Sequence, residues 1–408
     1  MIRPTVAALT TTVLTAGLLA LGGSPGQAAE LSFVTPEGLF LIESGGRDRT
    51  PLLPTAESSV NGLAWSPSGQ QLAVVQNYGQ VYRVTSPTHT PELVFSSQCS
   101  RSPSLELTWQ PTGDTLVIAE RCPAAAAGDP PQWALFLSQG DGALTPITTL
   151  PTTLDSAPYL SPDGQRVAYV HNQHLFVAEL DGSRSQRLTQ TPGTYGAAGS
   201  PLAWSPDSTR LAFYEGNYPF QRLNVIGVDG SDRRVLTPEP NAQIYRSRLF
   251  WSPDGRYIAF YRPHNPPLSN QEVIALVNVN TGEIQTVTRP GFYDAVSWAP
   301  DSQQLVLASG VQAGQQTLFL LDLVSQEFTP LNPQPLQNVL DSQWAPDGSW
   351  IAFTGSPLDD ALGTQVLHWV KADGSQFNAV TTPEEYVYPF TWVPAASPPS
   401  APGLGQTP

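Results

Sequence analysis

The chain has 408 residues, of which only 13% are charged, together with 33 glycines and 41 prolines. Many turn formers and few charges are typical of an all-β protein built from short strands. The formal net charge is -15 with a single lysine, Lys371, so a phosphate backbone would be repelled and no nucleic acid partner is expected.

Residues 1–29 have the pattern of a signal peptide. Arg3 supplies the positive start, Val6 to Leu21 is apolar, and small residues precede Ala29. No cysteine follows the apolar run, which excludes a lipoprotein anchor, and an uncleaved membrane anchor is the alternative. The mature chain is therefore expected to be periplasmic or secreted, with no stable membrane span after cleavage.

One short unit recurs along the rest of the chain, and Trp251-Ser252-Pro253-Asp254-Gly255 followed by an apolar run is its clearest copy. Proline, aspartate and glycine at these positions favour a tight turn between two strands. Copies start every 44 to 51 residues (65 to 109, 109 to 160), a period that holds the four strands of one propeller blade. The leading residues are Trp65, Trp109, Leu160, Trp204, Trp251, Trp298, Trp344 and Trp392.

The second copy carries the two cysteines of the chain, Cys99 and Cys122, which flank one predicted hairpin. The turn Gln110–Gly113 would bring the two arms together, and an exported protein can form disulfides. We predict a Cys99–Cys122 disulfide.

Five aspartates recur in the turns, but each belongs to a different blade, so turn chemistry is favoured over a metal site. The histidines are five, and the pair His171 and His174 offers too few ligands for zinc. No metal, cofactor or catalytic residue is predicted.

The two ends of the repeat region complement each other. Leu31–Val34 is typical of a second blade strand without a first, and Phe390–Pro394 of a first strand without a second. Joining them closes the ring without a free sheet edge. We therefore predict an eight-bladed β-propeller over residues 30–394, with seven blades as the alternative, and a disordered Pro-rich tail over residues 395–408.

The Trp-Ser-Pro-Asp-Gly units and the Asp-Gly…Leu-Thr elements, such as Asp181-Gly182…Leu188-Thr189, resemble the TolB-type β-propeller family with its WD40-like repeats. The resemblance implies a non-catalytic, extracytoplasmic interaction module. Two features differ from relatives of this kind. Residues 1–30 are too few to supply the α/β domain of the Tol component, and residues 30–394 contain no Gly-x-Ser-x-Gly elbow like that of the oligopeptidases.

Two kinds of loop lie at opposite ends of each blade, and the more variable kind joins the second strand to the third and one blade to the next. Binding residues concentrate on such loops. We expect a protein or peptide partner, with envelope-associated proteins among the candidates, to bind there at the central funnel through Tyr195, Tyr245, Arg246, Arg248, Tyr293, Asp294, Asp341, Tyr386 and Tyr388. Shielding of blade edges by these tyrosines, a purely structural scaffold, and a propeller hydrolase or lyase acting on glycan or peptide in the channel are the alternatives.

Overall fold

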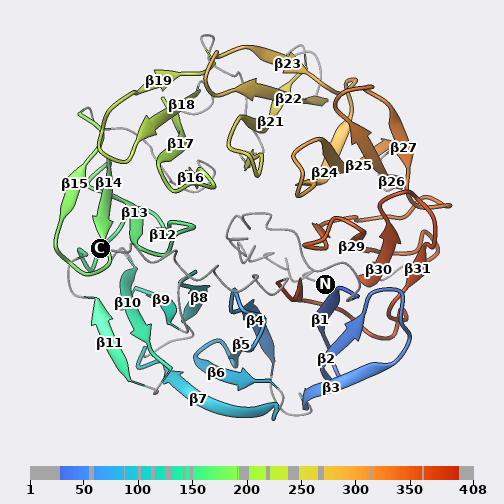
Figure 1. The fold of residues 1–408 in the computed structure, drawn as a ribbon, viewed down its shortest axis with the longest axis horizontal. Helices are drawn as coiled ribbons and strands as arrows, with labels where there is room; N and C mark the ends of the chain where they lie inside the picture. Colours follow the sequence, from blue (N-terminus) through green and yellow to red (C-terminus); the bar gives the residue numbers. More distant parts are fainter. Residues whose placement is uncertain are drawn as a thin grey trace, which may run out of the picture.

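The computed structural model describes residues 28–54, 59–86, 88–99, 103–111, 115–124, 131–140, 143–147, 150–190, 192, 202–216, 221–237, 248–264, 271–312, 315–360 and 363–394. Eight four-stranded antiparallel sheets form a ring, with their outermost strands at its rim (Figure 1). The predicted eight-bladed propeller is confirmed, and the seven-bladed alternative is wrong.

Each blade runs from an innermost strand a to an outermost strand d, and seven blades follow chain order. Their strands are, for blade 1, β4 (Val60–Trp65), β5 (Gln71–Gln76), β6 (Gln80–Thr85) and β7 (Thr90–Ser96); for blade 2, β8 (Ser104–Trp109), β9 (Leu116–Cys122), β10 (Gln132–Ser138) and β11 (Leu144–Ile147); for blade 3, β12 (Tyr159–Leu160), β13 (Arg166–His171), β14 (His174–Glu179) and β15 (Ser185–Arg187); for blade 4, β16 (Leu202–Trp204), β17 (Arg210–Glu215), β18 (Arg222–Gly227) and β19 (Arg234–Val235). The next three are blade 5 with β20 (Leu249–Trp251), β21 (Tyr257–Pro263), β22 (Glu272–Asn278) and β23 (Ile284–Thr286); blade 6 with β24 (Phe292–Trp298), β25 (Gln304–Gln312), β26 (Gln315–Asp322) and β27 (Phe328–Pro330); and blade 7 with β28 (Ser342–Trp344), β29 (Trp350–Gly355), β30 (Val366–Lys371) and β31 (Asn378–Ala379).

Blade 8 combines the two ends of the described chain. Its strand a is β32 (Phe390–Trp392), which pairs with β1 (Glu30–Thr35), and β2 (Gly38–Glu43) and β3 (Arg49–Pro54) complete the sheet. Phe33 lies opposite Phe390, as the split-blade prediction requires. The Arg49 guanidinium also donates to the Glu385 carboxylate, and this ion pair ties β3 to the connection that leads into β32.

The repeated turn is stabilised by its own side chains. In blade 5 the Ser252 hydroxyl donates to Asp254 Oδ1, and the same carboxylate oxygen accepts the Arg256 N–H at 3.0 Å. Asp163, Asp207, Asp301 and Asp347 likewise accept an N–H two residues on. The carboxylates therefore serve the turns, in line with the interpretation as turn chemistry.

The Leu-Thr element has a second local role. The hydroxyl of its threonine accepts the N–H of the second or third residue of strand c in its own blade, and so pairs a buried donor near the start of that strand. The bond recurs at 2.8–3.0 Å from Thr189, Thr237, Thr288 and Thr381.

Eight apolar clusters form the core, one between each pair of neighbouring blades. The motif tryptophan packs toward the preceding blade, and its indole N–H donates to a strand a carbonyl there. In blade 4, Trp204 is 6% exposed and donates to the Tyr159 carbonyl at 2.8 Å. The same bond is made by Trp109, Trp251, Trp298 and Trp392.

Three junctions depart from this pattern. Between blades 8 and 1 the Trp65 N–H donates to the Ser32 hydroxyl on β1 at 2.9 Å rather than to a strand a carbonyl. Between blades 2 and 3 the motif residue is Leu160, which has no N–H to donate. Between blades 6 and 7, β24 carries a register shift, the Ser342 hydroxyl donates to the Ala295 carbonyl, and the buried Trp344 N–H has no hydrogen-bond partner within the described chain.

The predicted disulfide is present. Cys99 and Cys122 are bonded with their Cα atoms 5.5 Å apart, which joins the connection before β8 to the end of β9. The part of the chain that the structure describes contains no helix long and apolar enough to cross a membrane. The predicted signal peptide, apart from its last two residues, and the predicted tail lie outside the described residues.

Candidate functional site

Charged residues stand at one repeated position of the innermost strands. Glu106, Arg248 and Asp341 each stand three residues before the motif aromatic residue of their blade. That position directly precedes strand a in blades 5 and 7 and is the third residue of strand a in blade 2. We call these three residues the channel mouth.

Glu106 is one of two acids of the channel mouth with a raised pKa. Burial in β8 raises the pKa of its carboxyl to about 7, since desolvation disfavours the charged form. The side chain of Tyr159, at the start of blade 3, is close enough for the two groups to influence each other. Burial first, and the Glu106 charge second, raise the pKa of Tyr159 to about 12. With a pKa of about 7, the Glu106 carboxyl can both donate and accept a proton near neutral pH. The Tyr159 phenol stays protonated there and can act as a proton donor.

Asp341 and Arg248 form the second charged region of the channel mouth. Burial raises the pKa of the Asp341 carboxyl, while a hydrogen bond with the Gln343 side chain and the positive charge of Arg248 act in the opposite direction. Arg248 itself is exposed. The pair thus combines a half-buried carboxyl with an accessible guanidinium, an arrangement that can hold a polar substrate.

A pocket of about 280 Å³ opens at the seam between blades 8 and 1. Tyr386 and Tyr388 line it from the connection into β32, and their side chains are 55% and 38% exposed. Residues from the β1–β2 turn and from the start of β4 complete the wall, namely Val34, Thr35, Pro36, Ser59 and Val60. The β1–β2 turn and the connections between blades, which were expected to share a face, meet at this pocket. The rings and hydroxyls of Tyr386 and Tyr388 can stack on a ligand and form hydrogen bonds with it.

The other predicted binding residues differ in where the structure places them. Tyr293 is 5% exposed, and its hydroxyl donates to the Arg289 carbonyl at 2.5 Å, so its ring belongs to the core between blades 5 and 6. Asp294 accepts a hydrogen bond from the Gln316 side chain at 2.8 Å. Tyr195, Tyr245 and Arg246 lie outside the described residues.

Sequence reasoning missed Glu106 and Tyr159. It searched the connections that lead into strand a, whereas Glu106 lies inside the strand. A signal was available, because Glu106 occupies the same repeat position as Arg248 and Asp341, both of which were selected.

Comparison with known proteins supports the fold and gives matches both to a TolB propeller domain and to propeller-containing enzymes. Residues 216–397 match the family model of the TolB beta propeller domain, and residues 140–218 match that of the dipeptidyl peptidase IV N-terminal region. The predicted resemblance to TolB-type propellers is confirmed. No curated protein matches the sequence.

Solved structures with this fold include enzymes. A eukaryotic initiation factor aligns with a TM-score of 0.58 and 13% identity, covering 91% of this chain and 99% of the other. Puromycin hydrolase aligns with a TM-score of 0.53 and 14% identity. The alignment covers 83% of this chain and 60% of the enzyme, so this chain spans about three fifths of that enzyme. An oligogalacturonate lyase in complex with manganese aligns with a TM-score of 0.50 and 15% identity, and the alignment covers 83% of this chain and 84% of the lyase.

These matches correct the functional prediction. A non-catalytic propeller that binds a protein or peptide partner was expected, but the dipeptidyl peptidase IV match and the hydrolase and lyase structures favour the enzyme alternative. The matches remain mixed, since the TolB model describes a propeller domain without naming an activity.

The described residues offer one group with the geometry of metal ligands, Cys99, Glu120 and Cys122, and both of its cysteines are disulfide-bonded. It lies in blade 2 near Glu106, since Glu120 pairs with Leu105 between β9 and β8. We therefore derive no step through manganese.

Proposed function

We propose that this chain, a TolB-type β-propeller, is an extracytoplasmic enzyme that cleaves a glycan in its central channel, with Glu106 as the acid–base residue. The observation that carries the proposal is the desolvation of the half-buried Glu106 carboxyl on the innermost strand β8, which raises its pKa to about 7. A carboxyl poised near the working pH can both donate and accept a proton during cleavage.

The other groups of the site have supporting roles in this proposal. Tyr159, whose phenol stays neutral at physiological pH, would donate a proton to the departing glycosidic oxygen. Arg248 and Asp341 would hold polar groups of the substrate, and Tyr386 and Tyr388 would stack on sugar rings at the seam pocket. The oligogalacturonate lyase is a precedent for a glycan-cleaving propeller, because this chain covers 84% of its length.

Location outside the cytoplasm is part of the proposal. The TolB resemblance, the signal-like residues 1–29 and the disulfide support it. Cleavage of the signal would be checked by N-terminal sequencing of exported protein, where an intact Met1 would contradict it.

The test is an activity screen with a matched pair of variants. Purified protein is incubated with oligogalacturonides and with neutral xylo- and cello-oligosaccharides, and new reducing ends are measured together with ultraviolet absorbance of unsaturated products. Absorbing products identify a lyase and their absence a hydrolase. Glu106→Gln is expected to lower kcat by about 10²–10⁴-fold. Glu283→Gln, at an exposed turn, should retain activity. Wild type that cleaves none of these glycans, or Glu106→Gln with full activity, would overturn the proposal.

A second candidate, cleavage of a peptide or amide bond, is favoured by the match of residues 140–218 to the dipeptidyl peptidase IV N-terminal region. Chromogenic aminoacyl and dipeptidyl substrates belong in the same screen. Turnover of these by wild type, without turnover of any glycan, would replace the first candidate by the second.

A further inference from the structure

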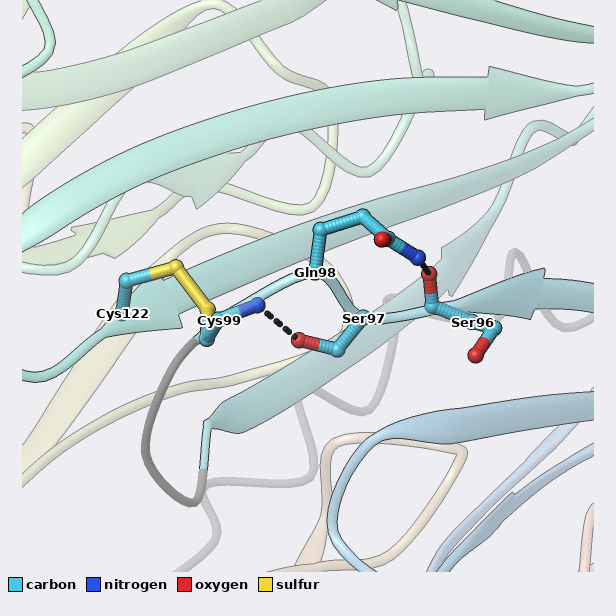
Figure 2. The surroundings of a disulfide bond; sticks show 5 residues. All are labelled: Ser96, Ser97, Gln98, Cys99 and Cys122. Atoms are coloured by element: carbon cyan, nitrogen blue, oxygen red, sulfur yellow. Dashed lines mark hydrogen bonds between the residues drawn. A yellow bond between two sulfur atoms is a disulfide. The ribbon is translucent and has the colours of Figure 1, made fainter.

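The disulfide lies at the wall of a second pocket, outside the channel. This pocket has a volume of about 360 Å³ and is lined by Asn77, Gly79, Gln80, Ser96, Ser97, Cys99 and Pro103. Figure 2 shows Cys99 at the end of the short segment from Ser96, with its N–H directed to the Ser97 hydroxyl at 3.1 Å and its sulfur bonded to Cys122. Both cysteines are half-buried, and Cys99 can be reached from the pocket.

A buried carboxylate stands beside the two sulfurs. Glu120 precedes Cys122 by two positions on β9, so the two side chains lie on the same face of the strand. Glu120 is only 6% exposed, yet its Oε1 has no hydrogen-bond partner within the described chain. One ligand atom from each of Cys99, Glu120 and Cys122 lies within 4.8 Å of the other two. A buried acceptor without a donor is costly, and a cation is one way to satisfy it.

We propose that reduction of the Cys99–Cys122 disulfide converts this group into a binding site for zinc or a similar divalent ion. A dithiol reductant donates two electrons and two protons, so that the S–S bond breaks, two thiols form, and the reductant becomes a cyclic disulfide. The ion then binds two thiolates and the Glu120 carboxylate, and the two thiol protons pass to solvent.

The donor set suits zinc in particular. Thiolates and a carboxylate are ordinary zinc ligands, and three protein ligands leave a fourth tetrahedral position. Because Cys99 lines the pocket, that fourth position would be supplied from it by water or by a small ligand. The Cα atoms of the cysteines are 5.5 Å apart, so the thiolates stay within reach of one ion after the bond is broken. The site would exist in the reduced protein alone, which makes metal binding a readout of redox state.

The experiment uses the full-length protein reduced with a phosphine and then freed of reductant under nitrogen. Cobalt is the probe, since tetrahedral cobalt thiolate has intense visible and near-ultraviolet bands, and zinc competition gives the affinity. Reduced wild type is expected to bind one cobalt ion that zinc displaces, and oxidised wild type none. Glu120→Gln should weaken zinc binding by at least about tenfold, comparable to the loss of other groups at zinc sites. Glu92→Gln, at an exposed position of β7, is the matched control and should bind as wild type does.

Three results would overturn the proposal: no thiolate–cobalt bands in reduced protein that retains the β circular dichroism of the oxidised form, loss of that signal on reduction, or unchanged zinc affinity in Glu120→Gln.

Discussion

The junctions between blades are of two kinds, and the proposed site coincides with the irregular kind. At the junctions before blades 4, 5 and 6, a motif tryptophan fills the space and donates its N–H to the neighbouring strand a. At the junction between blades 2 and 3, Leu160 replaces the tryptophan, and before blade 7 the Trp344 N–H has no hydrogen-bond partner in the described part of the chain. Glu106 and Asp341, the channel acids with raised pKa values, lie next to these two junctions.

The difference separates residues that hold the ring from residues that can do chemistry. A repeated tryptophan satisfies its own N–H and buries a large apolar area, so the regular junctions carry stability. Next to the two junctions that lack this bond, the carboxyls of Glu106 and Asp341 are desolvated, and their pKa values rise. Strained or costly groups of this kind are often found at functional sites.

The largest expected effect is loss of a regular junction. Trp204→Ala should lower the free energy of unfolding by about 3–5 kcal/mol, because it opens a cavity between blades 3 and 4 and leaves the Tyr159 carbonyl without its donor. Urea unfolding followed by circular dichroism measures it. Val324→Ala, at a position 84% exposed, is the control and should change stability by less than about 0.5 kcal/mol.

Blade 2 has no tryptophan contact from blade 3 and carries the disulfide instead. Replacing both Cys99 and Cys122 by serine should cost about 3 kcal/mol, because the bond closes a loop with a sequence separation of 23. The same unfolding assay applies, with reduced wild type as the comparison. Equal stability of the serine variant and oxidised wild type would show that the bond is not needed to hold this irregular blade.

Glu106 should make stability depend on pH. Its pKa is raised from 4.5 to about 7 in the folded protein, so the folded state favours the proton. Its contribution is most favourable below pH 4.5 and is lost as the pH rises through 7. Glu106→Gln should therefore gain stability relative to wild type over this interval, by no more than about 3 kcal/mol. Melting temperatures of both proteins between pH 4 and 8 measure it, and a constant difference would contradict the assignment.

The smallest effect distinguishes the two kinds of junction directly. Trp204→Phe removes an indole N–H that donates at 2.8 Å, and should cost about 1–3 kcal/mol. Trp344→Phe removes an N–H that lacks a partner among the described residues, and should cost at least about 1 kcal/mol less. Equal losses in the two variants would mean that the indole bonds do not set the regular junctions apart.

Most of the fold could be predicted from the sequence because it depends on local, repeated chemistry. The Ser-Pro-Asp-Gly turn forms within its own residues, and the pairing of Phe33 with Phe390 follows from two incomplete blades that need each other's edge. The Cys99–Cys122 bond followed from the hairpin between them.

The site could be predicted only in part, since it depends on packing between blades. Arg248 and Asp341 were selected by type and position, and the Arg248 charge acts on the Asp341 carboxyl. Tyr293 is equally polar-tipped in sequence, but its ring is buried between blades 5 and 6, and only its hydroxyl bond to Arg289 reveals why. Glu106 was missed because burial, which sets its pKa, is not visible in an alternating strand.

The most direct test of the account is the pKa of Glu106 itself. Carbon-13 NMR of labelled glutamate side chains, titrated in wild type and assigned with Glu106→Gln, gives that value without any substrate. The account predicts a carboxyl that titrates near pH 7. A Glu106 that titrates near the ordinary value of 4.5 would contradict the proposed acid–base site.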